Sequence, residues 1–179
     1  MSYALSALPR GRVLDVVRAP AQVLAEPAPR VDPADEDVAQ LCADLVATMR
    51  VSPGCVGLAA PQVGRSAQAF CVDVTGHPKA RTQSGLIVLL NAEVTRSSRN
   101  ERAREGCMSV PDLTGDVKRA TRVTVTGQLP VTGELVEVES DAFEARALQH
   151  EIDHCAGLLF LDRVAGAHAL HARKVYLSE

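Results

Sequence analysis

The sequence predicts an α+β fold in a single domain, residues 1–179, because strand-like runs lie between two helical segments. The first helical segment opens at Pro33 and carries an apolar stripe at helical spacing: Val38, Leu41, Cys42, Leu45, Val46 and Met49. The second helical segment extends from about Asp141 to Ala156. We expect antiparallel or mixed sheets to pack around this second helix, in the C-terminal half of the chain.

The strands are predicted from short apolar runs and from alternation. Gln68–Val74 and Gly85–Val94 are apolar runs separated by a polar loop, "GHPKARTQSG". Apolar and polar residues alternate in "RVTVTG" and "GELVEVES", which predicts a hairpin around Gly127 and Gly133. The proline-rich segment from Arg18 to Pro33 is expected to be extended, and the tail after Ala156 to hold one short helix.

Composition excludes several classes of protein. The chain has 179 residues, is 46% hydrophobic, and has a net charge of −3 with both signs mixed along it. A DNA-binding surface would need a basic patch, and a membrane span would need about 20 consecutive apolar residues. The sequence contains neither, so both classes of protein are disfavoured. The N-terminus lacks the features of a signal peptide, and the five cysteines form no C-x-x-C pair. These features favour a bacterial cytoplasm over an organelle.

A metal site is indicated by the stretch "ALQHEIDHCAG". On a helix, His150 and His154 lie one turn apart on one face, so both imidazoles can reach a single ion. Glu151 lies about 100° round the helix from His150, which suits a base better than a ligand. The alternative is a solvated amphipathic helix with chance histidines.

A catalytic ion needs a third protein ligand, and the sequence offers several. The extended zinc-peptidase pattern would place a histidine where this chain has Phe160. Asp162 could turn back toward the helix, whereas His168 and His171 lie in a polar tail. Upstream, Cys107 in "EGCMSVPDL" offers a thiolate next to Gly106, although a buried structural cysteine is equally consistent with the residues alone.

A third segment, "GCVGLAAPQVG", has the composition of a tight loop. Gly57 and two alanines allow close backbone packing, and Gln62 supplies an amide donor that could stabilise an oxyanion. Alone, this segment is equally well explained as a structural turn.

Together, "CVGLAAPQ", "EGCMS" and "HEIDH" resemble the three ordered motifs of the peptide deformylase family. The resemblance extends from about Val13 to Asp162. It implies a hydrolase that removes the formyl group from the N-formylmethionine of nascent polypeptides and releases formate. The implied partners are those formylmethionyl peptides, with the ribosome as a further candidate partner. DNA and membranes are not expected as partners.

The resemblance also assigns the metal ligands and the catalytic groups. Cys107, His150 and His154 would bind one divalent ion, with Fe(II) as first choice and Ni(II), Co(II) or Zn(II) as substitutes. Glu151 would be the general acid and base.

The resemblance implies further roles around the formyl group. Gln62 and the backbone N–H of Met108 would bind the formyl oxygen in the transition state. Substrate-binding positions would be Gly57, Val56, Gly106 and Glu105.

Three departures from the family pattern stand out. Cys55 replaces the first glycine of the loop motif, and a cysteine, Cys155, follows His154 where a leucine is usual. The tail after Asp162 is also short. The residues that carry the chemistry are all present, so an active enzyme is expected. Two alternatives are a zinc endopeptidase with Asp162 as third ligand and a non-catalytic paralogue that binds metal or peptide.

Overall fold

The structure is a computed structural model that describes residues 8–173, so the ends of the predicted domain, residues 1–7 and 174–179, lie outside it. Its helices and strands, in chain order, are α1 (Glu36–Val51), β1 (Gly57–Ala59), β2 (Ala69–Val72), β3 (Ile87–Cys107), β4 (Val110–Gln128), β5 (Leu135–Asp141), α2 (Ala142–Cys155) and β6 (Leu170–Ala172). Four short 3-10 helices complete it: Gln22–Leu24, Ala60–Val63, Phe160–Arg163 and Ala167–Ala169. The predicted α+β class is therefore confirmed.

Helix α1 begins at Glu36, three residues after the predicted start at Pro33. The Asp35 side chain accepts a hydrogen bond from the N–H of Asp37 at 2.8 Å, which caps the first turn. The predicted apolar stripe is buried and packs with residues of β1, β2 and β3 in one core cluster. The stripe thus fixes which face of α1 meets the sheet.

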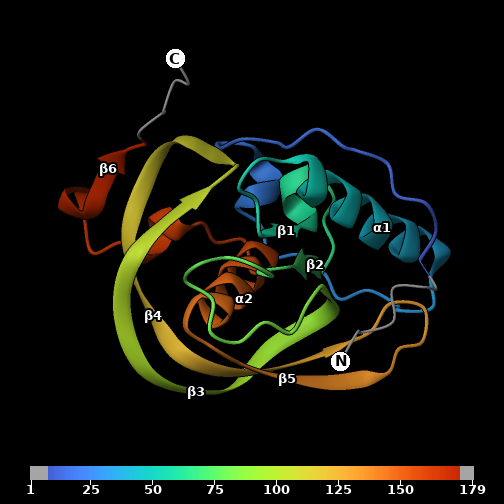
Figure 1. The fold of residues 1–179 in the computed structure, drawn as a ribbon. Coiled ribbons are helices and arrows are strands. Elements are labelled where there is room, and N and C mark those ends of the chain that lie inside the picture. Colours follow the sequence, from blue (N-terminus) through green and yellow to red (C-terminus); the bar gives the residue numbers. More distant parts are fainter. Residues whose placement is uncertain (1–7, 174–179) are drawn as a thin grey trace.

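The strands form a six-stranded sheet in the order β1-β2-β3-β4-β5, with β6 paired to β4, and every pairing is antiparallel. Figure 1 shows α2 near the centre of the molecule, with the long curved strands β3 and β4 running round it and α1 on the other side. The predicted strand Gly85–Val94 is only the start of β3, which has 21 residues. Its second half is polar and mostly exposed, so no apolar pattern marked it.

The predicted hairpin is present as β4 and β5, and the predicted second helix is α2. The tail differs from expectation: two 3-10 turns and the short strand β6 replace a single helix. A hydrophobic cluster that includes Ala145 and Leu148 joins α2 to β2, β3, β4 and β5. Within residues 8–173, no helix is both long and apolar enough to cross a membrane.

Candidate metal centre

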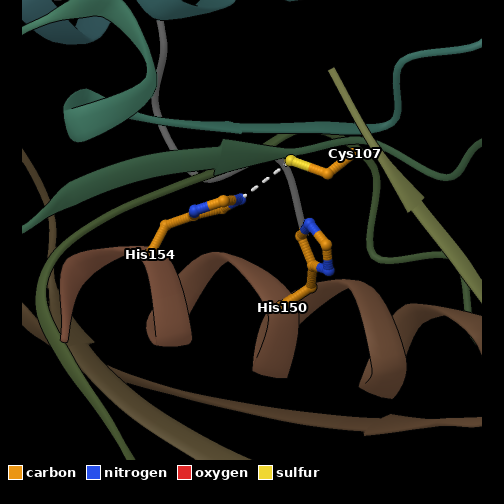
Figure 2. A group of neighbouring side chains, drawn as sticks. All are labelled: Cys107, His150 and His154. Carbon is orange, nitrogen blue, oxygen red and sulfur yellow. Dashed lines mark hydrogen bonds between the residues drawn. The ribbon is translucent and has the colours of Figure 1, made fainter. Parts of the chain in front are cut away.

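Two histidines on one face of α2 meet a cysteine at the end of β3. Side-chain atoms of Cys107, His150 and His154 all lie within 4.8 Å of one another. The Cys107 Sγ is 3.3 Å from His154 Nε2, and Figure 2 shows both imidazoles directed from the helix toward the sulfur. The fold thus joins a strand end and a helix that are distant in the sequence into one compact donor set.

This donor set suits a transition-metal ion. One sulfur and two imidazole nitrogens are ligands that Fe(II), Ni(II), Co(II) and Zn(II) accept, and three protein ligands leave a position open for reaction. In a tetrahedral site, metal–ligand distances of about 2.0–2.3 Å place the donors about 3–4 Å apart. The 3.3 Å between Cys107 Sγ and His154 Nε2 lies in this range, and all three donors lie within 4.8 Å of one another, so the residues fit a divalent transition-metal ion.

Glu105 fixes the orientation of His150. The Glu105 carboxylate lies 3.0 Å from His150 Nδ1, which leaves Nε2 for the ion. Arg119 and Arg146 donate to the same carboxylate at 2.7 and 2.8 Å. Burial acts to raise the pKa of Glu105, but His150 and Arg119 outweigh it and hold the pKa well below its usual range. Glu105 therefore stays ionised.

The two histidines carry opposite pKa shifts. Burial lowers the pKa of His150, yet hydrogen bonds to Cys107 and Glu105 outweigh it and raise the pKa to about 10. Burial, with the positive charges of His150 and Arg119, lowers the pKa of His154 well below its usual range. A proton held on His150 would be displaced when an ion binds.

A second buried ion pair supports the same helix. Asp153 accepts from Arg119 at 2.6 Å and from Arg163 at 2.7 Å. Arg119 thereby connects Asp153 on α2 to Glu105 on β3.

Glu151 lies beside the donor set in a buried position. Its Oε2 atom has no hydrogen-bond partner among the described residues. Burial raises the pKa of this carboxyl to about 7, although His150 and Arg119 act to lower it. A buried carboxylate with a free oxygen and a pKa near neutrality is suited to transfer protons.

Gln62 is oriented by three contacts. Its Oε1 accepts from the N–H of Ala59 at 2.9 Å, and its Nε2 donates to Cys107 Sγ at 3.3 Å and to Ser109 Oγ at 3.4 Å. Only 2% of the residue is exposed, so the amide is held rigidly with its donor group toward the sulfur. This is the group that the sequence indicated as an oxyanion donor.

A cavity of about 280 Å³ opens over these groups. The residues predicted for catalysis or substrate binding all line it: Gln62, Val56, Gly57, Glu105, Gly106, Met108 and Glu151. Cys55 also lines it, and its Sγ lies 3.1 Å from the carbonyl oxygen of Gly57. The cysteine that replaces the usual glycine is therefore accommodated at the cavity wall.

Comparison with known proteins identifies the family. The sequence model of the polypeptide deformylase family matches residues 13–169. The chain belongs to this family. It is 39% identical over 153 residues to the peptide deformylase of Thermodesulfovibrio yellowstonii, covering 86% of this chain and 90% of that protein.

Solved deformylase structures share the fold. The peptide deformylase of Thermotoga maritima has a TM-score of 0.77 at 33% identity, covering 87% of this chain and 99% of that one. A class I type b peptide deformylase from Acinetobacter baumannii with bound Met-Ala-Ser has the same TM-score at 35% identity, covering 86% and 99%. These findings support a deformylase hydrolase and give no support to the endopeptidase alternative.

The position of Asp162 in this deformylase agrees with that conclusion. Asp162 is exposed, and its carboxylate accepts a hydrogen bond from the N–H of Leu159 at 2.8 Å. His168 is exposed, and His171 lies 3.0 Å from Asp116. None of these downstream candidates joins the donor set formed by Cys107 and the two α2 histidines.

Sequence reasoning missed the arginines around the deformylase centre. Arg119 on β4 and Arg146 on α2 lie in no recognised motif, and each acts through a carboxylate distant in the sequence. The only signal in the sequence was indirect: a buried glutamate beside a metal ligand needs a cationic partner.

Proposed function

We propose that this deformylase removes the formyl group from N-terminal formylmethionine of nascent polypeptides and releases formate. The observation that carries the proposal is the buried carboxylate of Glu151 beside the donor set of Cys107, His150 and His154. Glu151, Cys107 and His150 line one cavity. The similar A. baumannii deformylase binds Met-Ala-Ser in its crystal structure, and this peptide has the sequence of a deformylated N-terminus. We also propose that residues 1–179 form one catalytic domain.

We infer that Cys107, His150 and His154 hold Fe(II), with Ni(II), Co(II) or Zn(II) as substitutes. When bound, such an ion supplies a Lewis acid that acidifies water and polarises the formyl carbonyl. The thiolate favours a transition metal over magnesium or calcium, which prefer oxygen ligands. Glu105, rather than contacting substrate, is assigned to hold His150 in the ligating orientation.

Glu151 is assigned to move the proton. Its free Oε2 accepts a proton from the attacking water and then delivers it to the departing amine of methionine. A pKa of about 7 suits both halves of this transfer, because the group can bind and release the proton near neutral pH. Gly57 makes room for the carboxylate.

Gln62 and the backbone N–H of Met108 are assigned to the developing oxyanion. The Nε2 of Gln62 is already oriented toward the ligand sulfur. Removal of one preorganised donor of this kind typically raises the barrier by about 3–4 kcal/mol.

The peptide is assigned to the cavity walls. Val56, Gly57 and Gly106 offer backbone groups to the substrate main chain, and Ala147 with Phe143 offers apolar surface for the methionine side chain. The formyl carbon carries only hydrogen, so a narrow site admits it and excludes larger acyl groups. Such a pocket discriminates by about 1–3 kcal/mol per methylene.

The cellular setting is the bacterial cytoplasm, with nascent chains at the ribosome as the source of substrate. This setting agrees with the bacterial deformylases among the relatives. We propose neither DNA nor a membrane as a partner.

The test is formate release from formyl-Met-Ala-Ser by protein purified without oxygen. Wild-type protein should release stoichiometric formate, and Glu151→Gln should retain metal but lose about 10²–10⁴-fold in kcat. An unformylated peptide with internal methionine serves as control. Cleavage of that control without formate release from the formylated peptide would refute the proposal.

A further inference from the structure

The short strand β6 brings an arginine to the catalytic cavity from the end of the described chain. β6 pairs with β4 through Leu113↔Ala172 and Thr114↔His171. The next residue, Arg173, donates its backbone N–H to the carbonyl of Asp112 at 2.9 Å. The backbone of Arg173 is thus fixed to β4.

The guanidinium of Arg173 lies on the cavity wall over Gly106. A methyl group added to Gly106 would collide with Nη2 of Arg173, so the guanidinium lies directly against the glycine. Its other contact is a long hydrogen bond of 3.5 Å to the carbonyl oxygen of Cys107. Arg173 is therefore immediately next to a metal-ligand residue and a predicted substrate-binding glycine.

This arginine differs from the other two arginines that line the cavity. Arg104 pairs with Asp116 at 2.7 Å, and Arg146 pairs with Glu105 at 2.8 Å. Between residues 8 and 173, no carboxylate pairs with Arg173. A guanidinium has five N–H donors in a planar fork that matches a carboxylate, and within this part of the chain at most one is used.

We propose that Arg173 is a substrate-binding residue that selects acidic side chains in the residues following formylmethionine. The proposal rests on the deformylase activity proposed above. With the formyl group at Cys107, an extended peptide advances about 3.3 Å per residue. We place its second and third residues along the cavity wall at Gly106, the predicted substrate-binding glycine against which Arg173 lies. A carboxylate there would meet the guanidinium donors of Arg173, whereas a lysine would meet a like charge.

The experiment compares three amidated peptides: formyl-Met-Asp-Asp, formyl-Met-Asn-Asn and formyl-Met-Lys-Lys. Amidation removes the terminal carboxylate, which would otherwise bind the same arginine. At low salt, wild-type kcat/KM should be about 5- to 10-fold higher for the Asp peptide than for the Lys peptide, mainly through KM. The ratio should shrink in 0.5 M salt, because screening weakens partly exposed charge pairs.

Arg173→Gln should bring the Asp-to-Lys ratio of kcat/KM near 1, and Arg173→Glu should invert that ratio. Arg96→Gln is the matched control, since it makes the same charge change at an exposed residue of β3 that pairs with Glu137 of β5. Arg96 is not among the residues that line the catalytic cavity. A ratio that survives Arg173→Gln would overturn the inference. Failure of wild-type protein to deformylate even the Asn peptide would instead contradict the proposed function.

Discussion

The α-carbon of Gly57 faces the carboxylate of Glu151 at a distance that admits no side chain. A methyl group on Gly57 would lie 2.5 Å from Oε1 and 2.9 Å from Cδ of Glu151. Glu151 is buried and lies on α2, whereas Gly57 begins β1. The glycine is thus required by the position of the proposed proton carrier.

Gly57→Ala should therefore displace the Glu151 carboxylate and lower kcat by about 10-fold or more, since a displacement of about 1 Å at a catalytic group can cost about 10²-fold in rate. The metal content should stay near that of wild type. Metal analysis and steady-state kinetics on the same preparation would check this. Gly76→Ala is the control for kcat, because no atom lies within 4 Å of the added methyl group; the left-handed backbone there (φ 77°) makes the substitution locally strained but leaves the cavity untouched. Unchanged kcat in Gly57→Ala would remove the steric argument.

Replacement of the sulfur ligand separates the deformylase and endopeptidase assignments. Cys107→Ser should lose most bound metal and activity, because a neutral hydroxyl is a much poorer ligand than a thiolate. Asp162→Ala should keep both, since that carboxylate caps a turn outside the donor set. Metal content by elemental analysis is the measurement. The reverse result, with metal lost only in Asp162→Ala, would make Asp162 the third ligand.

Glu105 should control metal affinity without touching the metal. Glu105→Gln removes the charge that faces His150, Arg119 and Arg146, so we expect zinc affinity to fall about 10- to 100-fold. The unfolding free energy should fall by about 3 kcal/mol, because buried Arg146 loses its carboxylate partner and buried Arg119 keeps only Asp153. Competition with a zinc chelator and denaturant titration would measure these effects.

Asp116→Asn is the matched control for Glu105. Asp116 also bridges an arginine and a histidine, but on a more exposed part of the same hairpin. Exposed pairs contribute about 0–1 kcal/mol, so both quantities should stay close to wild type. Equal effects in the two variants would mean that Glu105 acts only as a structural ion-pair partner.

The contrast between β3 and α2 explains what the sequence could predict. The α2 residues carry both a helical apolar pattern and a motif, so helix, histidines and Glu151 were predicted together. The second half of β3 has neither, because its exposed polar residues are held by backbone pairing with the neighbouring strand β4, which leaves no apolar pattern in the sequence. Arg119, Arg146 and Arg173 were missed for the same reason: their roles depend on contacts that only the folded sheet creates.

The proposed iron centre should be sensitive to oxygen. A thiolate beside Fe(II) exposes both the sulfur and the ion to oxidants, whereas Ni(II) does not undergo the same oxidation readily. Iron-loaded protein should therefore lose activity in air within hours, and nickel-loaded protein should lose it several-fold more slowly. Parallel decay curves in air and under argon are the measurement. Identical decay of both forms in air would take away the main physical reason for preferring iron.

The contact between Arg12, in the N-terminal segment before α1, and Asp44 of α1 should add stability that is lost at acidic pH. Asp44 on α1 accepts hydrogen bonds at 2.7 Å from the backbone N–H and from Nη2 of Arg12. Burial acts to raise the pKa of Asp44, but Arg12 and Gln40 outweigh it and lower the pKa below its usual value. A carboxyl with a depressed folded-state pKa stabilises above its unfolded-state pKa, and this stabilisation is lost as pH falls through the folded-state value.

Asp44→Asn should therefore destabilise the protein by about 1–2 kcal/mol at pH 7, which corresponds to a Tm lower by about 2–8 °C for a chain of this size. The difference from wild type should begin to narrow as pH falls below about 4, where the unfolded carboxyl takes up a proton while the folded one is still ionised, and should vanish only below the folded-state pKa. Thermal unfolding of both proteins at pH 7, 5 and 3.5 is the measurement, with Asp37→Asn on the exposed first turn of α1 as control. A Tm difference that is constant across this range would show that the stabilisation comes from packing and neutral hydrogen bonds of residue 44, and not from the charge on Asp44.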